Sequence, residues 1–499
     1  MQKNKPRKPI TIFGNEIGLR TMLLIIQCVI SIALTAIIIK LGILPDKYVA
    51  LLIAGLAFLS IITFLLMIPT ADVTQGEKTI KKGKVRYIIG IVFSVVVSIC
   101  LLVGVKMAWQ GDTALRTIVG HGLETREAYL VVLKDSKYEK PKDLADNPVA
   151  MDPKDDKVIM EPALNALKAE AEELNLMELE GCDKLADALY NGDAEAIFIS
   201  DATYAIIQTK HETFGDDTRV IFAHTIEIKS EDFSKDVNDI TKNSFCVYIT
   251  GIDTYGRLSN VARSDVNMIV TVNPETKQVL LSSIPRDYFI RLSNMGTEDK
   301  LTHSGLAGPQ NTVKSVEDFL GIDINYYARV NFSSVVDIVD ALGGITVDNP
   351  VSFYASPYQF DAGKIDMNGE EALRFARERY NVSGGDNGRV KNQELVVEGM
   401  INKLLSPAIL KNYTGFLKSI DGTFQTNMEA EEISDLVKMQ LDDMAKWTIV
   451  QKQFKGHGSM QYGGAYYPNE KLYYMIPDDD SVAENKQAIQ NVLDGVTTE

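Results

Sequence analysis

The chain has 499 residues and a formal net charge of −16, and this length exceeds that of one ordinary domain. The first 109 residues hold 13 Lys and Arg against 4 Asp and Glu, whereas the remainder holds 38 against 63. Because so acidic a surface repels polyanions, the composition excludes a general nucleic-acid-binding function for the part after residue 109.

Three apolar runs near the N-terminus predict membrane-spanning helices. They cover Met22–Ile39, Tyr48–Ile68 and Tyr87–Val105, which are 18, 21 and 19 residues long. At about 1.5 Å per residue each run forms a helix of roughly 27 to 32 Å, which matches the hydrocarbon thickness of a bilayer. Three long runs in series do not fit a cleaved signal peptide, which has one short apolar region.

Basic residues before the first and third runs predict the orientation, because Lys and Arg mark the cytoplasmic side of a span. They are Lys3, Lys5, Arg7, Lys8 and Arg20, followed by Lys78, Lys81, Lys82, Lys84 and Arg86. From a cytoplasmic N-terminus, three crossings place the chain after about residue 109 outside the cell. We therefore expect a multi-pass protein of the cell membrane with an extracellular functional part.

Residues 110–235 predict a small α/β domain. Strands are expected at 128–134 and 196–200, and apolar residues recur at helical spacing between 160 and 178. No catalytic constellation is evident in this segment, so we expect an accessory role. Its Cys182 and the later Cys246 either form one disulfide or remain two buried thiols.

Three strands are predicted after residue 244. They cover "FCVYITGID" (245–253), "DVNMIVTV" (265–272) and "QVLLSSIPRD" (278–287), and the turn "NPETK" makes the last two a hairpin. If the first two strands are also antiparallel neighbours, their charged ends share one edge of the sheet. That edge collects Asp253, Arg263, Asp265 and Arg286.

The residue types at this edge suit phosphate chemistry. Two carboxylates, Asp253 and Asp265, can hold a hard divalent cation whose remaining ligands are water and phosphate oxygens. The flanking arginines suit bidentate contacts to phosphate. The alternative is ordinary surface ion pairs such as Asp265 with Arg263 or Asp287 with Arg286, each contributing about 0 to 1 kcal/mol.

The stretch "RFARERYNVSGGDNGRVKNQ" (374–393) adds further arginines. Arg377 and Arg379 are two residues apart, so on a helix their side chains would point in nearly opposite directions. We therefore predict that the preceding helix ends near Phe375 and that residues 376–380 are extended, with both guanidinium groups on the same side.

A second helix is predicted from about Arg389 to Leu405, with a polar start and an apolar stripe along one face. The stripe contains Arg389, Gln393, Val396, Val397, Met400 and Leu404. It fits an amphiphile, with a pyrophosphate at the helix N-terminus and a hydrocarbon along the apolar part. The alternative is a helix that packs on the core.

A helix over residues 333–344, capped by Ser333 and ended by Gly343, offers an opposite wall. The candidate wall residues are Val336, Val339 and Leu342. They are equally what a helix packed against a sheet requires.

Five motifs between about residues 245 and 455 together resemble the LytR-CpsA-Psr family. In order they are "GIDTYG", "ARSDVNMIVTVNPETKQVLLSSIPRD", "KLTHSG", "VNFSSVVDIVDALGGITV" and "FARERYNVSGGDNGRVKNQ". Three membrane spans followed by an extra domain are similar to the CpsA branch of that family. The resemblance implies a membrane segment (1–109), an extracellular accessory domain (110–235) and a catalytic α/β sandwich with a mixed central sheet and a prenyl pocket (245–499).

The resemblance also implies an activity, namely a phosphotransferase that attaches a glycan, here capsular polysaccharide, from undecaprenyl pyrophosphate to peptidoglycan in a Gram-positive bacterium. Asp253 and Asp265 would hold Mg²⁺ or Mn²⁺. The pyrophosphate ligands would be Arg263, Arg286, Lys300, Arg377, Arg379, Arg389 and Gln393. Asn392 and Lys391 depart from the family, which commonly has arginine at these positions. Other capsule-assembly membrane proteins are expected partners, and nucleic acid is not.

No Ser-His-Asp or Cys-His set is evident, and His303 is predicted to be structural, so a metal and arginines would act by positioning and neutralising charge. Two alternatives remain open: a protein that binds the lipid-linked glycan and presents it to another enzyme, or a pyrophosphate hydrolase. A transcriptional regulator would need a cytoplasmic DNA-binding segment, for which the expected cytoplasmic parts are too short.

Overall fold

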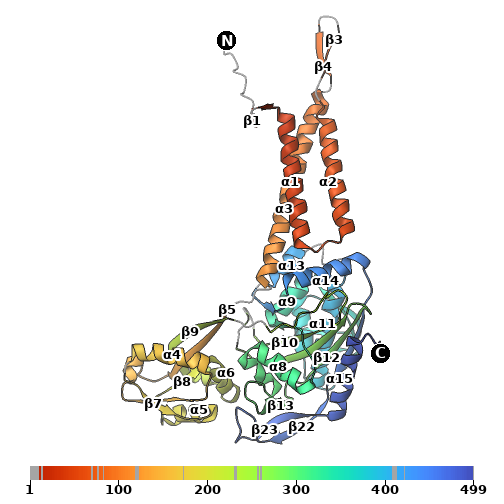
Figure 1. Cartoon of the computed structure of the whole chain (residues 1–499). Coiled ribbons are helices and arrows are strands. Elements are labelled where there is room, and N and C mark those ends of the chain that lie inside the picture. Colours follow the sequence, from red (N-terminus) through yellow and green to blue (C-terminus); the bar gives the residue numbers. More distant parts are fainter. Residues whose placement is uncertain are drawn as a thin grey trace. The chain divides into compact units, whose positions relative to one another are not determined.

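The computed structural model divides into two compact units whose elements are labelled in Figure 1. It describes all residues except 1–9, 13–14, 69–70, 76–77, 83, 119–122, 172, 230–232, 255–257, 259–260, 407–412, 421 and 498–499. The membrane unit comprises residues 1–117, 410–418 and 429–444, and the outer unit comprises 118–409, 419–428 and 445–499. The chain therefore passes between the units at five points, after residues 117, 409, 418, 428 and 444.

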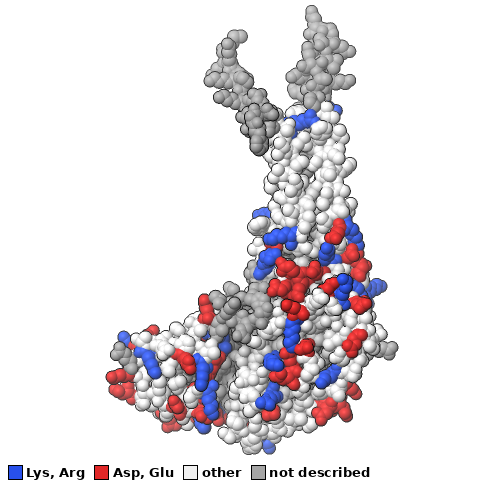
Figure 2. All heavy atoms as spheres, in the orientation of Figure 1, with Lys and Arg blue, Asp and Glu red and all other residues white. Residues whose placement is uncertain are grey.

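Three helices of the membrane unit are long and apolar enough to cross a bilayer, as predicted. They are α1 (Leu19–Leu41), α2 (Asp46–Leu66) and α3 (Lys84–Ile118), accompanied by the short strands β1 (Ile10–Ile12), β2 (Asn15–Ile17), β3 (Ala71–Gln75) and β4 (Lys78–Lys82). Figure 2 shows their surface almost free of charge between charged ends. Lys3, Lys5, Arg7 and Lys8, on which the predicted orientation partly depends, lie outside the described residues.

A buried polar contact joins the three membrane helices. The Gln27 side-chain oxygen accepts hydrogen bonds from Thr63 of α2 (3.1 Å) and Ser94 of α3 (3.2 Å). Such bonds hold helices together where apolar contact alone gives no preference over lipid.

Helix α3 continues beyond residue 109, the predicted end of the membrane segment. The predicted domain boundaries stay predictions.

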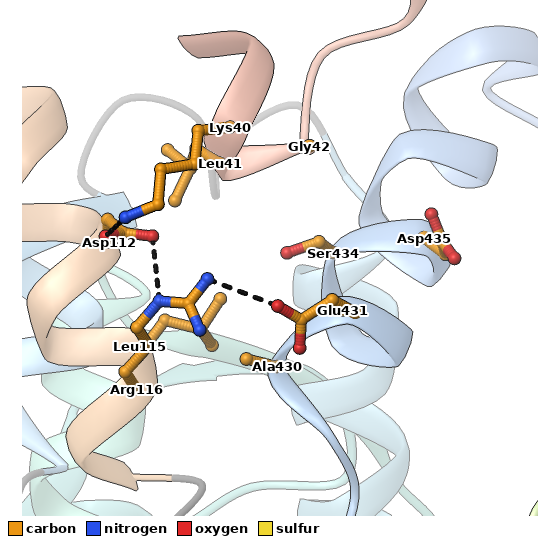
Figure 3. A pocket seen from close by; sticks show the side chains of 10 residues that line it. All are labelled: Lys40, Leu41, Gly42, Asp112, Leu115, Arg116, Ala430, Glu431, Ser434 and Asp435. Atoms are coloured by element: carbon orange, nitrogen blue, oxygen red, sulfur yellow. Dashed lines mark hydrogen bonds and ion pairs between the residues drawn. The ribbon is translucent and has the colours of Figure 1, made fainter. Parts of the chain in front are cut away.

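Two later helices, α13 (Tyr413–Ser419) and α14 (Ala430–Asp443), extend into the membrane unit. Arg116 of α3 contacts Glu431 (3.2 Å), and Lys438 contacts Asp46 of α2 (3.0 Å). Figure 3 shows the Arg116 guanidinium between Asp112 and Glu431, beside a cavity of about 190 Å³. Ion pairs thus tie α14 to the ends of the membrane helices.

The outer unit is built on a six-stranded mixed sheet with the order β20-β15-β10-β11-β12-β21. In that order the strands are Phe424–Thr426, Tyr326–Val330, Phe245–Gly251, Val266–Asn273, Gln278–Ser283 and Thr448–Gln453. The predicted β11–β12 hairpin and the antiparallel β10–β11 pair are confirmed. The β10–β15 and β12–β21 pairs are parallel.

Helices cover both faces of this sheet, as an α/β sandwich requires. Ile269 and Leu280 pack with α8 (Pro309–Leu320) and α15 (Asp479–Leu493). Met268 and Leu281 lie on the opposite face with Val397 of α11 (Asp386–Leu404). The alternation follows from the two-residue period of a strand.

A second apolar cluster lies between α9 (Phe332–Ala341), α10 (Gly369–Arg377) and α11. Two small hairpins contribute to it, β16–β19 (Ile345–Asn349, Gly363–Met367) and β17–β18 (Phe353–Ala355, Tyr358–Phe360). The short elements that complete this part of the outer unit are β13 (Phe289–Arg291), β14 (Glu298–Lys300), η2 (Leu301–Ala307), β22 (Gly456–Gln461) and β23 (Leu472–Pro477).

The accessory segment forms a five-stranded sheet with the order β7-β6-β8-β5-β9. Its elements are β5 (Leu123–Leu133), η1 (Pro141–Leu144), β6 (Pro148–Met151), α4 (Lys157–Glu170), β7 (Asn175–Glu178), α5 (Cys182–Asn191), β8 (Ala196–Ser200), α6 (Asp201–Lys210), α7 (Phe214–Asp217) and β9 (Thr218–Lys229). The predicted helix over 160–178 is wrong in its last part, because residues 175–178 pair with β6. Cys182 and Cys246 are both buried and unpaired.

The predicted extended segment at 376–380 is also wrong. Helix α10 continues to Arg377, and the next residues form a turn rather than a strand. The Glu378 carboxylate accepts hydrogen bonds from the backbone amides of Tyr380 (2.7 Å) and Asn381 (2.9 Å). Such local bonds replace the ladder bonds that a strand would need.

Two predicted helix starts also differ from the structure. Asn331, not Ser333, caps α9, because its side chain accepts from the Ser334 amide at 2.9 Å. The helix α11 begins at Asp386 rather than at Arg389. Arg389 therefore lies one turn inside the helix.

Candidate active site

Backbone hydrogen bonds bring four segments, from three of the sequence motifs, together at one edge of the six-stranded sheet. The Asp265 amide donates to Gly251 O (2.8 Å), and the Ser264 amide donates to Thr302 O (2.9 Å). The Thr302 amide in turn donates to Arg286 O (2.8 Å). The end of β10, the start of β11, the segment after β12 and η2 are thereby fixed side by side, as the sequence predicted for the first three.

A glycine allows η2 to approach the start of β11. A Cβ atom added at Gly305 would lie 2.5 Å from Ala262 O and 2.8 Å from Ser264 N, closer than a side chain tolerates. The glycine in "KLTHSG" therefore supports the segment that carries Arg263 and Asp265.

A buried network of hydrogen bonds between side chains also holds the start of β11 in place. Tyr248 Oη donates to Asn267 Oδ1 at 2.6 Å, and Ser264 Oγ donates to the same atom at 2.6 Å. Thr250 Oγ1 lies 2.6 Å from Ser264 Oγ. Because every member has a partner, the network holds the backbone at Asp265 in one conformation.

Asp265 contacts the cationic group that follows β12. Its Oδ1 accepts hydrogen bonds from Arg286 Nη1 (2.8 Å) and Thr302 Oγ1 (3.4 Å). Burial opposes the charge of Arg286, but Asp265 and Asp287 outweigh this effect and raise its pKa. Arg286 Nε is buried and makes no hydrogen bond within the described part of the chain.

Helix α11 contributes a second buried guanidinium to this site. Arg389 is 13% exposed and contacts Asp386 Oδ1 at 2.7 Å, while its Nε has no hydrogen-bond partner among the described residues. Burial lowers the pKa of Arg389, and the charges of Arg286 and Arg379 lower it further against the attraction of Asp386 and Asp265. Arg286 and Arg389 therefore repel each other, and an anion that contacts both would relieve that repulsion. The side chain of Arg379 is exposed, and its guanidinium lies 4.7 Å from the centre of the Tyr380 ring.

The remaining predicted polar residues lie around this cluster. Arg377 is 3.8 Å from the exposed carboxylate of Asp253, and its guanidinium lies 3.9 Å from the centre of the Phe332 ring. Lys300 is 3.3 Å from Asp287. Arg263 and Gln393 are exposed and half-buried respectively. Their contacts with a ligand stay predictions.

The two predicted metal ligands come from adjacent chain segments, because Asp265 pairs with Gly251, two residues before Asp253. Oδ1 of Asp265 takes both of its hydrogen bonds, which leaves Oδ2 for a cation. Over the described ranges no group of three or more His, Cys, Asp or Glu could hold a metal. The pair therefore fits Mg²⁺ or Mn²⁺ only if water and phosphate supply the other ligands.

The apolar residues predicted to line a prenyl pocket do not lie in one place, because some belong to the cluster between α9, α10 and α11 and others to the cluster between α11 and the sheet. Val339 and Val396 share a buried cluster that Met400 also contacts. Val397 packs against the sheet instead, and Leu404 is exposed. Val336 is half-buried and Leu342 is buried. Packing alone accounts for Val339 and Val396, and a prenyl chain beside them stays a prediction.

A buried aspartate and histidine support the loop before the site, as predicted for His303. Nδ1 of His303 lies 3.0 Å from Asp299 Oδ1, and the Lys300 and Tyr466 amides donate to the Asp299 carboxylate at 2.7 and 3.1 Å. Burial would raise the pKa of Asp299, but these contacts lower it. Tyr467, the next residue, donates its hydroxyl hydrogen bond to Ile206 O of the accessory segment at 2.9 Å.

Glu394 is a residue that sequence reasoning missed. It is fully buried on α11, where Gln453 Nε2 donates to its Oε2 at 3.2 Å and Lys391 lies 3.6 Å away. Burial raises the pKa of Glu394 to about 7, despite opposing contacts with Ser283, Lys391 and Gln453. The sequence signal that could have indicated a buried acidic residue was the position of Glu394 directly before the apolar pair Leu395 and Val396.

Comparison with known proteins gives the following relatives. The chain matches the LytR_cpsA_psr family over residues 211–489. It is 35% identical over 273 residues to the polyisoprenyl-teichoic acid–peptidoglycan teichoic acid transferase TagU of Enterococcus faecalis, covering 54% of this chain and 86% of the relative. It is 36% identical over 268 residues to TagU of Bacillus subtilis, covering 53% and 83%.

Solved structures are also similar in sequence to this chain. The crystal structure of B. subtilis TagU is 31% identical, with a TM-score of 0.41, and covers 50% of this chain and 97% of its own. A structure described as TagT bound to LIIa-WTA is 26% identical, with a TM-score of 0.42, and covers 52% and 94%.

Replacing Gly305 with alanine tests the close approach of η2. We expect Gly305→Ala to lower the free energy of unfolding of the full-length protein by about 1 to 3 kcal/mol, as overpacked sites do. Gly215→Ala is the control, because the nearest atom there, at 2.9 Å, is the end of the flexible Gln208 side chain. Chemical denaturation in detergent micelles measures the free energy of unfolding of both variants. Equal decreases in the two variants would contradict a close approach of η2 at Gly305.

Replacing Glu394 with glutamine tests its buried ionisation. A carboxyl whose pKa rises from 4.5 unfolded to about 7 folded contributes stability below pH 4.5 and loses it as the pH rises through 7. We therefore expect the free energy of unfolding of Glu394→Gln at pH 8 to exceed that of the wild type by up to about 3 kcal/mol, at about 1.4 kcal/mol per pKa unit. At pH 5 the gain in this free energy should be smaller.

Thermal unfolding at both pH values measures this difference. Glu298→Gln, at an exposed side chain, is the control for the loss of one negative charge. A gain for Glu394→Gln that does not change between pH 5 and pH 8 would show that the carboxyl is not the titrating group.

Proposed function

Because the chain belongs to the LytR-CpsA-Psr family, we propose that it attaches a glycan from an undecaprenyl-pyrophosphate carrier to peptidoglycan through a phosphodiester. The named activity of its relatives supports this proposal at the level of polymer transfer from a polyisoprenyl carrier to peptidoglycan. We further propose capsular polysaccharide as the glycan, on the basis of the three predicted spans and the accessory domain. The residues after α3 would then act outside the cell.

The observation that carries the proposal is the pair of partly buried arginines, Arg286 and Arg389, beside Asp265. Both guanidinium groups have a buried Nε without a hydrogen-bond partner among the described residues, and that of Arg286 lies 3.7 Å from Asp287 Oδ2. A pyrophosphate supplies several acceptor oxygens and enough negative charge to offset the mutual repulsion of the arginines. The acidic remainder of the surface disfavours other polyanions.

The reaction needs no covalent intermediate with the protein. An acceptor hydroxyl attacks the glycan-linked phosphorus, a new P–O bond forms, and the P–O bond to the polyprenyl phosphate breaks. Arg286 and Arg389 stabilise the negative charge on the departing phosphate. A magnesium ion held by Asp253 and Asp265 would neutralise further phosphate charge. Either carboxylate can accept the proton of the attacking hydroxyl.

Variants at the arginine cluster test this function. In proteoliposomes with lipid-linked glycan, Mg²⁺ and peptidoglycan, we expect Arg389→Ala and Asp265→Asn to lower turnover by about 100-fold or more, because each removes a contact to developing charge. Arg374→Ala is the control, since this exposed arginine pairs with Glu370 at 3.0 Å and should keep the wild-type rate.

The same assay distinguishes the alternative functions. Lipid-linked glycan that binds without any covalent product would indicate a presenting protein, and a released glycan phosphate without acceptor would indicate a hydrolase. Wild-type rates in both cluster variants would remove the cluster from the mechanism.

Metal removal gives an independent test. We expect a chelator to abolish transfer and added Mg²⁺ or Mn²⁺ to restore it, because two carboxylates beside a pyrophosphate form a site for a hard cation. Full activity in excess chelator would contradict the proposed role of Asp253 and Asp265.

A further inference from the structure

The β22–β23 hairpin presents large uncharged side chains to solvent. Met460 and Tyr473 are cross-strand partners, and Tyr462 directly follows Gln461, the last residue of β22. These side chains are 55%, 43% and 62% exposed. Monomeric proteins seldom expose such groups together without a binding role.

A glycine fixes the most central of these side chains. A Cβ atom added at Gly458 would lie 2.8 Å from Cε2 and 3.3 Å from Cζ of Tyr473. The Tyr473 ring therefore lies over the bare backbone of the neighbouring strand, in the space that any other residue would fill. It forms an aromatic surface whose position is set by the hairpin.

The hairpin is attached to the candidate active site. The Met475 amide donates to Asp287 O at 2.8 Å, and Tyr288 and Met475 form a parallel β-bridge. The Tyr474 ring lies 4.7 Å from the ring of Phe289 and 5.7 Å from the Lys300 ammonium. The strand that carries Tyr473 thus runs directly beside the segment that follows Arg286.

The charged groups near Tyr473 are paired with one another. Burial raises the pKa of Tyr473, and the carboxylates of Asp287 and Asp386 raise it further. These two carboxylates contact Arg286, Lys300 and Arg389, which offset their charge. A neutral sugar ring offers C–H groups to the aromatic surface and hydroxyl groups to these paired charges.

We propose that this face, formed by Gly458, Met460, Tyr462 and Tyr473, binds the sugar rings of the acceptor, a glycan strand of peptidoglycan. The inference rests on the proposed function and names the acceptor subsite of the same active site. The donor carries a pyrophosphate and is held by the arginine cluster. The acceptor reacts through a neutral hydroxyl, so its sugar ring must be positioned by a surface that recognises uncharged groups.

The kinetic test compares both substrates of the full-length protein in proteoliposomes. We expect Tyr473→Ala to raise KM for peptidoglycan about tenfold, as the loss of a central aromatic contact does, with KM for the lipid-linked donor unchanged. Tyr473→Phe should retain the wild-type KM, and Gly458→Val, which displaces the ring, should behave like Tyr473→Ala. Tyr354→Ala is the control, because Tyr354 is 50% exposed on β17.

Three results would overturn the inference. They are an unchanged acceptor KM in Tyr473→Ala, an increase in donor KM instead, or a change of oligomeric state with the acceptor KM preserved, which would assign the face to a second copy of the chain.

A direct binding test separates this inference from the proposed function. Full-length protein in detergent micelles is sedimented with purified peptidoglycan in the absence of donor. We expect Tyr473→Ala to lose most of the sedimenting fraction and Tyr354→Ala to keep it, even if the wild-type protein forms no covalent product. Equal sedimentation of the two variants would contradict the acceptor subsite alone.

Discussion

Two partly buried guanidinium groups, those of Arg286 and Arg389, interact electrostatically with each other and with the carboxylate of Asp265, and the rest of the candidate site is organised around them. Arg286 contacts Asp265 and Asp287, and Arg389 contacts Asp386. Burial lowers the pKa of Arg389, and the nearby charge of Arg286 lowers it further. This arrangement is held by the amide-to-carbonyl bonds of Asp265, Ser264 and Thr302 and by the packing of α11 on the sheet.

The accessory segment is connected to these supports and is not merely a neighbour of the catalytic part. Leu306 of η2 and Tyr467 are buried in the same apolar cluster as side chains of α5 and α6. Tyr466 and Tyr467 are adjacent, and one contacts Asp299 whereas the other contacts Ile206. The loop before Lys300 and Thr302 is therefore held from both sides, which gives the accessory segment a physical path to the site.

The sequence predicted those features that depend on local pattern. Alternating apolar residues and the "NPETK" turn were enough for the β11–β12 hairpin, and long uncharged runs were enough for the three membrane helices. It failed where a distant or side-chain partner decided the outcome. Residues 175–178 form a strand because they pair with β6. The predicted strand after Arg377 is absent because the Glu378 side chain accepts a hydrogen bond from the backbone amide of Tyr380 and stabilises a turn. Buried Glu394 and the surface at Tyr473 depend on tertiary packing that no local period reveals.

The repeated passage of the chain between the two units has a consequence for proteolysis. Segments 410–418 and 429–444 belong to the same compact unit as the membrane helices, although both lie within the range 211–489 that matches the family. A single cleavage after α3 would therefore not release the outer part, because α13 and α14 would still be attached to the membrane unit. Cleavage there would release the outer unit only if the contacts of α14 with Arg116 and Asp46 were also broken.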